Sequence, residues 1–172
     1  MSTSTPSTDT AFAQLYRANA DRVMAYCLRQ VGQTDAEDVV SEAFLIAWRR
    51  RHVLPEPPLP WLLVTARNLI ADSRRRYARA VSGDAQVARL LSLAASDAVG
   101  EEVSRRQALI RALASLTDHD REALLMIAWD GLTAAQAAQV MGCSTATFNV
   151  RLHRARKRLE TAADDTVKRG AR

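Results

Sequence analysis

The side chains best suited to chemistry lie near the end of the chain, in residues 132–160. At about 100° per residue, one stripe of the helix expected there is apolar and holds Phe148, Leu152, Ala155 and Leu159. The opposite face and its flanks hold Asn149, Val150, Arg151, His153, Arg154, Arg156 and Lys157. Guanidinium groups suit phosphates, and an asparagine amide can both donate to and accept from a base edge, usually that of adenine. This pattern indicates contact with the major groove of duplex DNA.

Three small residues before that helix predict a tight turn between two helices. Ala138 allows the helices to cross closely, Gly142 can take a left-handed turn, and Ser144 can cap the following helix. The alternative is a positively charged surface helix that meets only water. Basic residues crowded together without matching acids favour DNA instead. These residues are Arg151, Arg154, Arg156, Lys157 and Arg158.

A second group of side chains, in residues 35–42, is acidic. Its members are Asp35, Glu37, Asp38 and Glu42, with no basic residue between them. We expect them at the start of a helix that Thr34 and Glu37 open with a capping box. The inward face of this helix is expected to hold Val40, Ala43, Phe44, Ala47 and Trp48. The helix macrodipole favours acids at this end, and a protein partner is an equally good explanation of the negative patch.

A third group follows the proline-rich residues 51–60, which cannot continue a helix and predict a stiff loop. The next helix is expected from Trp61 to about Arg79. One side of it combines a tryptophan, an asparagine and arginines, at Trp61, Asn68, Asp72, Arg75 and Arg79, with Arg67 and Arg74 beside them. Such a face suits unpaired nucleic acid, where bases stack on rings and phosphates meet guanidinium groups. We expect Asp72 to orient an arginine, and the alternative for Trp61 is packing against the loop as core.

Composition narrows the class of protein. The chain has 172 residues, of which 48% are hydrophobic and only 5% aromatic, and this favours an all-α fold of two small helical domains joined by a flexible linker. A net charge of +5 favours a polyanionic partner. No phosphate-binding loop, metal-ligand cluster or activated nucleophile supports an enzyme such as a nuclease, and we expect no catalytic residue, cofactor or metal.

The same sequence predicts a reduced, cytoplasmic protein. Cys27 and Cys143 stand alone and far apart. The first ten residues are polar and lack the apolar centre of a signal peptide, and no apolar run approaches the length of a membrane span, so no membrane insertion is expected.

Segments of weak periodicity suggest the domain boundaries. We expect a disordered tail at 1–10, a first domain at 11–80, a linker at 81–102, a second domain at 103–162 and a tail at 163–172. Within the second domain, Thr117 or Asp118 is expected to cap a helix that runs to Gly131.

Between Phe12 and Leu159 the chain resembles the bacterial sigma factors of the extracytoplasmic-function (ECF) group, within the sigma-70 family. Three motifs in this order carry the resemblance: DAEDVVSEAFLIAW, PWLLVTARNLIADSRRR and LTAAQAAQVMGCSTATFNVRLHRARKRL. The resemblance implies that the first domain corresponds to sigma region 2 and the second to sigma region 4. It further implies that the first motif binds core RNA polymerase, the second melts and reads the −10 element, and the third is a helix-turn-helix that reads the −35 element.

The resemblance also implies site residues. The core-binding residues would be Asp35, Glu37, Asp38, Ser41 and Glu42, although the family often has glutamine where Ser41 stands. The residues that match the −10 motif are Arg67, Asn68, Asp72, Arg75 and Arg76. Where the family commonly has a basic residue and a serine, this chain has Asn149 and Val150, so we expect its −35 preference to differ from the usual one.

The implied function is that of a dissociable transcription initiation subunit that performs no covalent chemistry. Its implied partners are the clamp and flap of RNA polymerase core, the duplex −35 and unpaired −10 promoter DNA, and an anti-sigma protein that sequesters it; the free protein would be a monomer. The alternative is a stand-alone helix-turn-helix transcriptional regulator. That alternative leaves the acidic segment and the face of Trp61 to Arg79 without a role.

Overall fold

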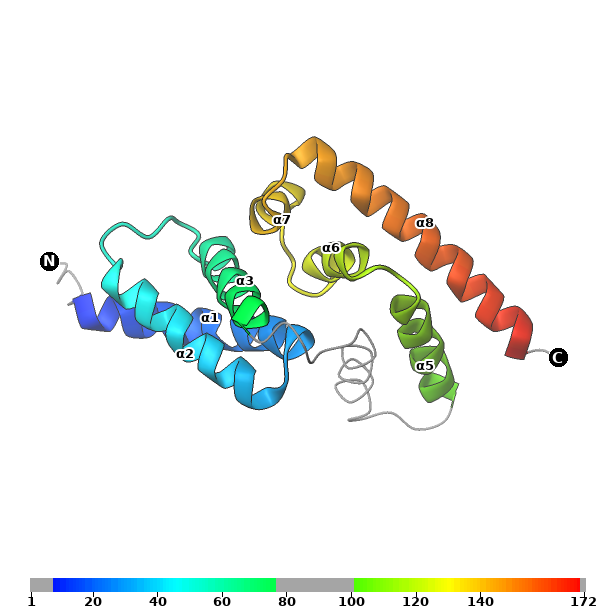
Figure 1. Ribbon diagram of the computed structural model, residues 1–172, viewed down its shortest axis with the longest axis horizontal. Coiled ribbons are helices and arrows are strands. Elements are labelled where there is room, and N and C mark those ends of the chain that lie inside the picture. The colour runs from blue at the N-terminus through cyan, green and yellow to red at the C-terminus, as the bar shows by residue number, and fades with distance from the viewer. Residues whose placement is uncertain (1–7, 77–100, 171–172) are drawn as a thin grey trace, which may run out of the picture. The chain divides into compact units, whose positions relative to one another are not determined.

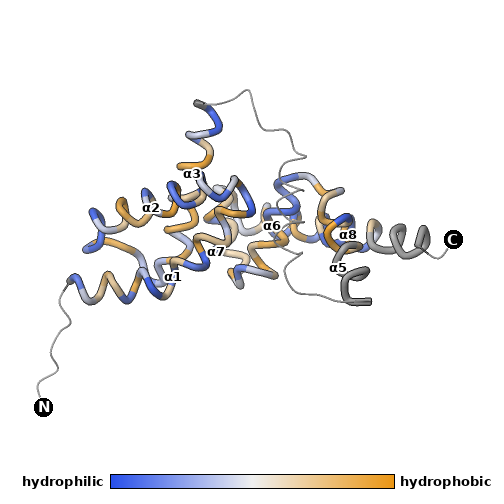
Figure 2. The backbone as a smooth tube through the Cα atoms, turned by 90° about the horizontal axis from the view of Figure 1, so that it is seen from below, coloured by the Kyte–Doolittle hydropathy of each residue, from blue (hydrophilic) through white to orange (hydrophobic). Residues whose placement is uncertain are grey.

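The computed structural model describes residues 8–76 and 101–170 as helices joined by turns and one longer loop (Figure 1). The chain divides into two compact units, Met1–Ala78 and Arg79–Arg172. No strand occurs within these described ranges, and the all-α prediction is confirmed. Along the parts of the helices that Figure 2 colours, hydrophilic and hydrophobic stretches alternate, so these helices have apolar surface available for packing (Figure 2).

The first unit is a bundle of three helices in which each packs against the other two. They are α1 (Thr8–Gln30), α2 (Gln33–Arg49) and α3 (Leu59–Arg76). The core takes residues from all three, among them Val23, Tyr26, Cys27, Ala36, Val40, Ala43, Phe44, Ala47, Leu62, Leu63, Ala66 and Ile70. The predicted inward face of α2 is confirmed, with Trp48 half-buried at its end.

Aromatic and sulfur-containing side chains fix the packing of α1. The Phe12 and Trp48 rings meet edge-on at 4.9 Å between centroids, and Tyr16 lies 4.6 Å from Phe44. Cys27 is fully buried in the same bundle. Burial raises the pKa of its thiol to about 12, against the opposing effect of the Arg29 charge.

The start of α2 differs from the prediction. The N-cap is Gly32 and makes no side-chain capping bond, so the capping box expected from Thr34 and Glu37 was wrong. Thr34 already lies in the first helical turn, where its backbone cannot take the extended conformation of an N-cap. Instead, Gln33 Nε2 donates to Glu37 Oε1 at 3.2 Å.

Arg51 anchors the proline-rich loop to the end of α2. Its guanidinium group lies 4.2 Å from the centroid of the Trp48 ring, and its Nη1 donates to the Trp48 carbonyl at 2.9 Å. The next helix, α3, begins at Leu59. Pro60 therefore lies in its first turn, where a missing N–H costs nothing.

The second unit is built around one long helix. Its described helices are α5 (Glu101–Ala114), α6 (Asp118–Ala128), α7 (Ala134–Met141) and α8 (Thr145–Gly170). α8 packs against α5, α6 and α7, and α6 also packs against α7. The core includes Ile110, Leu116, Ala123, Met126, Leu132, Ala137, Ala138, Val140, Phe148, Leu152 and Ala155.

Predicted turn and cap residues hold the helices of this unit in place. Thr117 Oγ1 accepts from the Asp120 N–H at 3.2 Å, Gly142 has φ +65°, and Ser144 Oγ accepts from the Thr147 N–H at 3.1 Å. These three predictions are confirmed. The capping box at the start of α7, between Thr133 and Gln136, was not predicted.

Several helix ends lie away from their expected positions. α1 begins at Thr8, inside the expected disordered tail, and α5 begins at Glu101, inside the expected linker. α8 continues to Gly170, through most of the expected tail, because no glycine or proline interrupts it before that residue. In contrast, α6 ends at Ala128, before Gly131. The remainder of the expected linker lies outside the described residues.

Candidate nucleic-acid interface

The first part of α8 presents two opposite faces. Phe148, Leu152 and Ala155 are buried, and Leu159 is half-buried. The opposite face is exposed and consists of Ala146, Asn149, Val150, His153, Arg154, Arg156 and Lys157, with Arg151 half-buried at its edge. The predicted division between a docking side and a free side is therefore confirmed. A single exposed helix that carries an amide, a valine and several cations has the composition of a major-groove reader.

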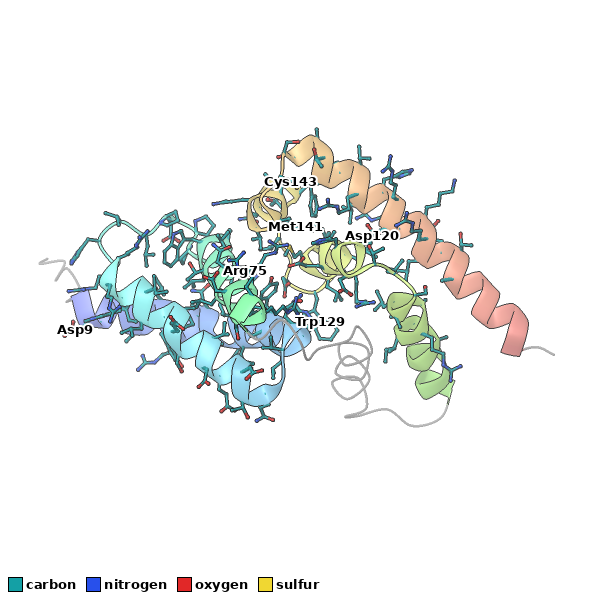
Figure 3. The ribbon with its side chains drawn as sticks, in the orientation of Figure 1. Asp9, Arg75, Asp120, Trp129, Met141 and Cys143 are labelled. Atoms are coloured by element: carbon teal, nitrogen blue, oxygen red, sulfur yellow. The ribbon has the colours of Figure 1, made fainter. Side chains whose placement is uncertain are left out.

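One member of the expected basic cluster is bound within the protein. Arg158 Nη1 donates to Asp120 Oδ2, an α6 carboxylate whose side chain is only 9% exposed; Asp120 is labelled in Figure 3. The prediction of five cations without a matching acid was wrong at Arg158, because its partner lies 38 positions earlier in the sequence. The pair connects α8 to α6 and removes one cation from the candidate DNA contacts.

The turn before α8 holds the start of that helix against α7. Cys143, labelled in Figure 3, is partly exposed in this turn, and its N–H donates to the Ala138 carbonyl at 3.0 Å. Ser144 and Thr147 also share a hydrogen bond between their hydroxyl groups at 2.8 Å. These contacts fix where the first turn of α8 begins, and so fix the direction of its exposed face.

The exposed face of α3 carries polar side chains, two of which are hydrogen-bonded to each other. Asn68, Asp72 and Arg75 are exposed, and Arg75 Nη2 donates to Asp72 Oδ1, which confirms that Asp72 orients an arginine (Figure 3 labels Arg75). Arg74 Nη2 donates to the Gln30 carbonyl at 2.8 Å and so ties α3 to the end of α1. Arg75 keeps 74% of its side chain exposed in this ion pair, so its guanidinium group is still accessible from solvent.

The other predicted residues of this face lie at its ends. Trp61 is half-buried in the first turn of α3, and Arg67 is half-buried midway along the helix. Arg76 is the last residue of α3, but its side chain is not among those described, and Arg79 lies outside the described residues.

The acidic residues of α2 form an exposed face. Asp35, Glu37, Asp38, Ser41 and Glu42 are all exposed, while Ala36, Val39 and Val40 between them are buried. The structure adds Leu45, which is 48% exposed about one turn beyond Ser41 and Glu42. Leu45 was not predicted from the sequence. Its position outside the buried stripe of Val40, Phe44 and Ala47 does, however, indicate an exposed side chain. The face therefore combines negative charge with one exposed aliphatic group.

Family models match both units. The model described as Sigma-70 region 2 matches residues 15–80, and the model described as Sigma-70, region 4 matches residues 106–159. The ECF RNA polymerase sigma factor SigL of Mycobacterium tuberculosis is 33% identical over 145 residues, which cover 81% of each chain. The chain belongs to the ECF RNA polymerase sigma factors. The α2, α3 and α8 faces are therefore three surfaces of a sigma factor.

Other relatives differ more in length from this sigma factor. BldN of Streptomyces coelicolor, an ECF sigma factor, is 31% identical over 165 residues, which are 92% of this chain and 62% of BldN. RfaY of Xanthomonas campestris, named as a probable RNA polymerase sigma factor, is 33% identical, and the match spans only 38% of its length.

A solved structure has the same fold. CnrH, determined in complex with the cytosolic domain of CnrY, superposes with a TM-score of 0.60 at 26% identity, over 90% of this chain and 88% of CnrH. None of the helices described in this sigma factor is both long and apolar enough to cross a membrane.

Proposed function

We propose that this sigma factor binds RNA polymerase core and directs promoter recognition and open-complex formation. The observation that carries the proposal is the separation of surfaces by charge. One unit exposes the acidic face of α2, and the other exposes the basic helix α8. An acidic surface repels DNA and suits a protein with basic groups, whereas a basic helix with an amide suits the major groove.

The proposed −35 contact is the exposed face of α8. Arg151, Arg154, Arg156 and Lys157 would meet phosphates, and Asn149, Val150 and His153 would face base edges. In a helix-turn-helix, residues near the start of the second helix reach the bases. Arg158 is left out of this set because Asp120 binds it.

The proposed −10 contact is the face of α3. Asn68 and the guanidinium groups of Arg67, Arg75, Arg76 and Arg79 would bind the strand, with Asp72 positioning Arg75. Trp61 offers a partly exposed ring on which an unpaired base can stack, and such stacking contributes about 1 to 3 kcal/mol per base.

The proposed core-binding surface is the α2 face of Asp35, Glu37, Asp38, Ser41 and Glu42. Leu45 extends it, since interfaces that rely on charge alone are weak and gain from a central apolar contact. The clamp would bind this face, and the flap would bind the second unit.

The proposal also covers the oligomeric state, location, chemistry and regulation of the chain. The chain would act as a monomer in the cytoplasm, where RNA polymerase and DNA are found, and would catalyse no covalent step and need no cofactor. An anti-sigma protein would hold it inactive. In support of that partner, the similar factor CnrH was determined in complex with the cytosolic domain of another protein, CnrY.

Run-off transcription tests the proposal directly. Purified chain and purified core polymerase are mixed with a library of promoter fragments from a bacterial genome, and transcripts are sequenced. We expect defined start sites only when chain and core are both present. Footprints on the same promoters by the chain without core, with no transcripts when core is added, would favour the stand-alone regulator instead.

A further inference from the structure

The first two turns of α8 expose a face without formal charge, on a helix that is otherwise strongly basic. The residues on this face are Ala146, Asn149, Val150 and His153, all exposed. Arg151 lies half-buried at the edge of this face, and the fully exposed cations of α8 begin at Arg154, Arg156 and Lys157. The fully exposed cations are thus displaced along the helix axis from this face, which lies next to the turn at Gly142.

Val150 stands out on this face because an exposed aliphatic side chain does not improve solubility. It is 52% exposed, whereas Leu152 and Leu159, the larger aliphatic residues of the same segment, are buried and half-buried respectively. Ala146 lies one turn before it on the same side, so the two methyl-bearing side chains form a short apolar strip. Asn149 lies beside that strip, and its amide can pair with the edge of a single base.

The major groove has one apolar group to offer such a strip, the 5-methyl group of thymine. Cations on the next turn would hold the phosphates on either side, so the strip would be pressed against base edges and not against the backbone. Two small aliphatic side chains are far below the size of an apolar patch that marks a protein–protein interface. The charge around the strip therefore favours DNA as its occupant.

We infer that Val150 contacts the 5-methyl group of a thymine in the −35 element, next to an adenine that Asn149 reads. The inference rests on the proposed promoter recognition and deepens it, because it names the base pairs that this chain prefers. It also attributes part of the preference for a −35 sequence to an apolar contact made by Val150.

The experiment uses the full chain bound to core polymerase. A library with randomised −35 positions is selected for binding, and the preferred duplex is then remade with deoxyuridine in place of each −35 thymine in turn. Deoxyuridine lacks only the methyl group and keeps every hydrogen-bonding group. We expect one such replacement to weaken holoenzyme binding about fourfold, the effect of losing one buried methyl group.

Variants of the chain assign that methyl contact to a residue. With Val150→Ser, thymine and deoxyuridine should bind equally at that position, because no methyl contact remains to be lost. Val150→Thr keeps one methyl and should keep part of the discrimination. Leu109→Ala is the matched control, since Leu109 is 49% exposed on α5 and its truncation should leave the discrimination unchanged.

The outcomes separate this inference from the proposed function. Equal binding of thymine and deoxyuridine by the natural chain at every −35 position overturns the methyl contact while promoter recognition stands. Discrimination that survives in Val150→Ser also overturns it, since another residue then makes the contact. Failure to enrich any −35 sequence overturns both the promoter recognition and the Val150 contact.

Discussion

A cation contributes to DNA binding only if the fold leaves its charge available, and neighbouring arginines in this chain differ in that respect. Arg158 is bound to Asp120 on α6, and Arg74 donates to the Gln30 carbonyl. Arg154, in contrast, lies on the exposed face of α8. The bound arginines hold helices together, and under the proposed function the exposed one would meet a phosphate.

The first prediction compares Arg154→Ala with Arg158→Ala. Each phosphate contact releases counterions, so we expect Arg154→Ala to reduce the slope of log affinity against log salt by about 0.9 at every promoter. Arg158→Ala should leave that slope unchanged and lower the free energy of unfolding instead, because it leaves the 9%-exposed Asp120 carboxylate without its partner. Salt titrations of holoenzyme binding measure the slope. A matching reduction in both variants would show that Arg158 also meets DNA.

The second prediction concerns Cys27 and alkaline pH. The thiol ionises near pH 9 in the unfolded chain, but burial raises its pKa to about 12 in the folded chain. Between these values the folded state holds one more proton, so the free energy of unfolding falls as pH rises, by about 1.4 kcal/mol per unit. Urea titrations at pH 8 and pH 10 should show a larger loss for the natural chain than for Cys27→Ala. Equal losses would contradict the buried thiol.

At the scale of helices, one buried arginine joins two elements of the second unit. Arg121 is 4% exposed, and its guanidinium group donates to the carbonyls of Leu113, Ala114 and Leu116 at 2.8 to 3.1 Å. These carbonyls lie at and just beyond the end of α5, where helix carbonyls lack partners. Arg121 also donates to Asp118 in the first turn of α6. A single side chain thus caps one helix and fixes the start of the next.

The third prediction follows from this geometry. Arg121→Met should lower the free energy of unfolding by about 3 kcal/mol, because three buried or partly buried carbonyls lose a donor together. Arg121→Lys should restore little of the lost stability. A single ammonium group cannot reach all the carbonyls that the planar guanidinium group contacts through more than one nitrogen. Urea denaturation followed by circular dichroism measures both. Near-complete rescue by lysine would mean that charge alone, without the fork geometry, stabilises this turn.

Helix faces could be predicted from the sequence, whereas pairings between distant helices could not. The buried stripe of α8 follows from helical periodicity, and Gly142 and Ser144 from the local demands of a turn. The Arg158–Asp120 pair depends on how α6 packs against α8, which periodicity does not encode. The Thr34 capping box failed for a related reason, because its spacing alone does not say where the helix begins.

The whole chain has a net charge of +5, but it carries surfaces of opposite charge. The exposed acids of α2 lie in the first unit and the exposed cations of α8 in the second, and each surface would repel the partner of the other. Under the proposed function, this separation would let one chain bind both a polyanion and a protein without the two competing for one site. The family assignment agrees with the arrangement, since region 2 and region 4 models match different units.

The fourth prediction tests this separation by reversing charge at Glu37 and Asp38. Both residues are exposed, so Glu37→Lys with Asp38→Lys should leave the unfolding curve nearly unchanged. The double variant should bind core polymerase at least tenfold more weakly, because four units of charge change on one face. Asp21→Lys is the control, a reversal of two units of charge at an exposed acid on α1 instead of α2. Equal weakening by Asp21→Lys would mean that overall charge, and not the α2 face, governs binding to core; unchanged affinity of the double variant in a pull-down would place the core contact elsewhere.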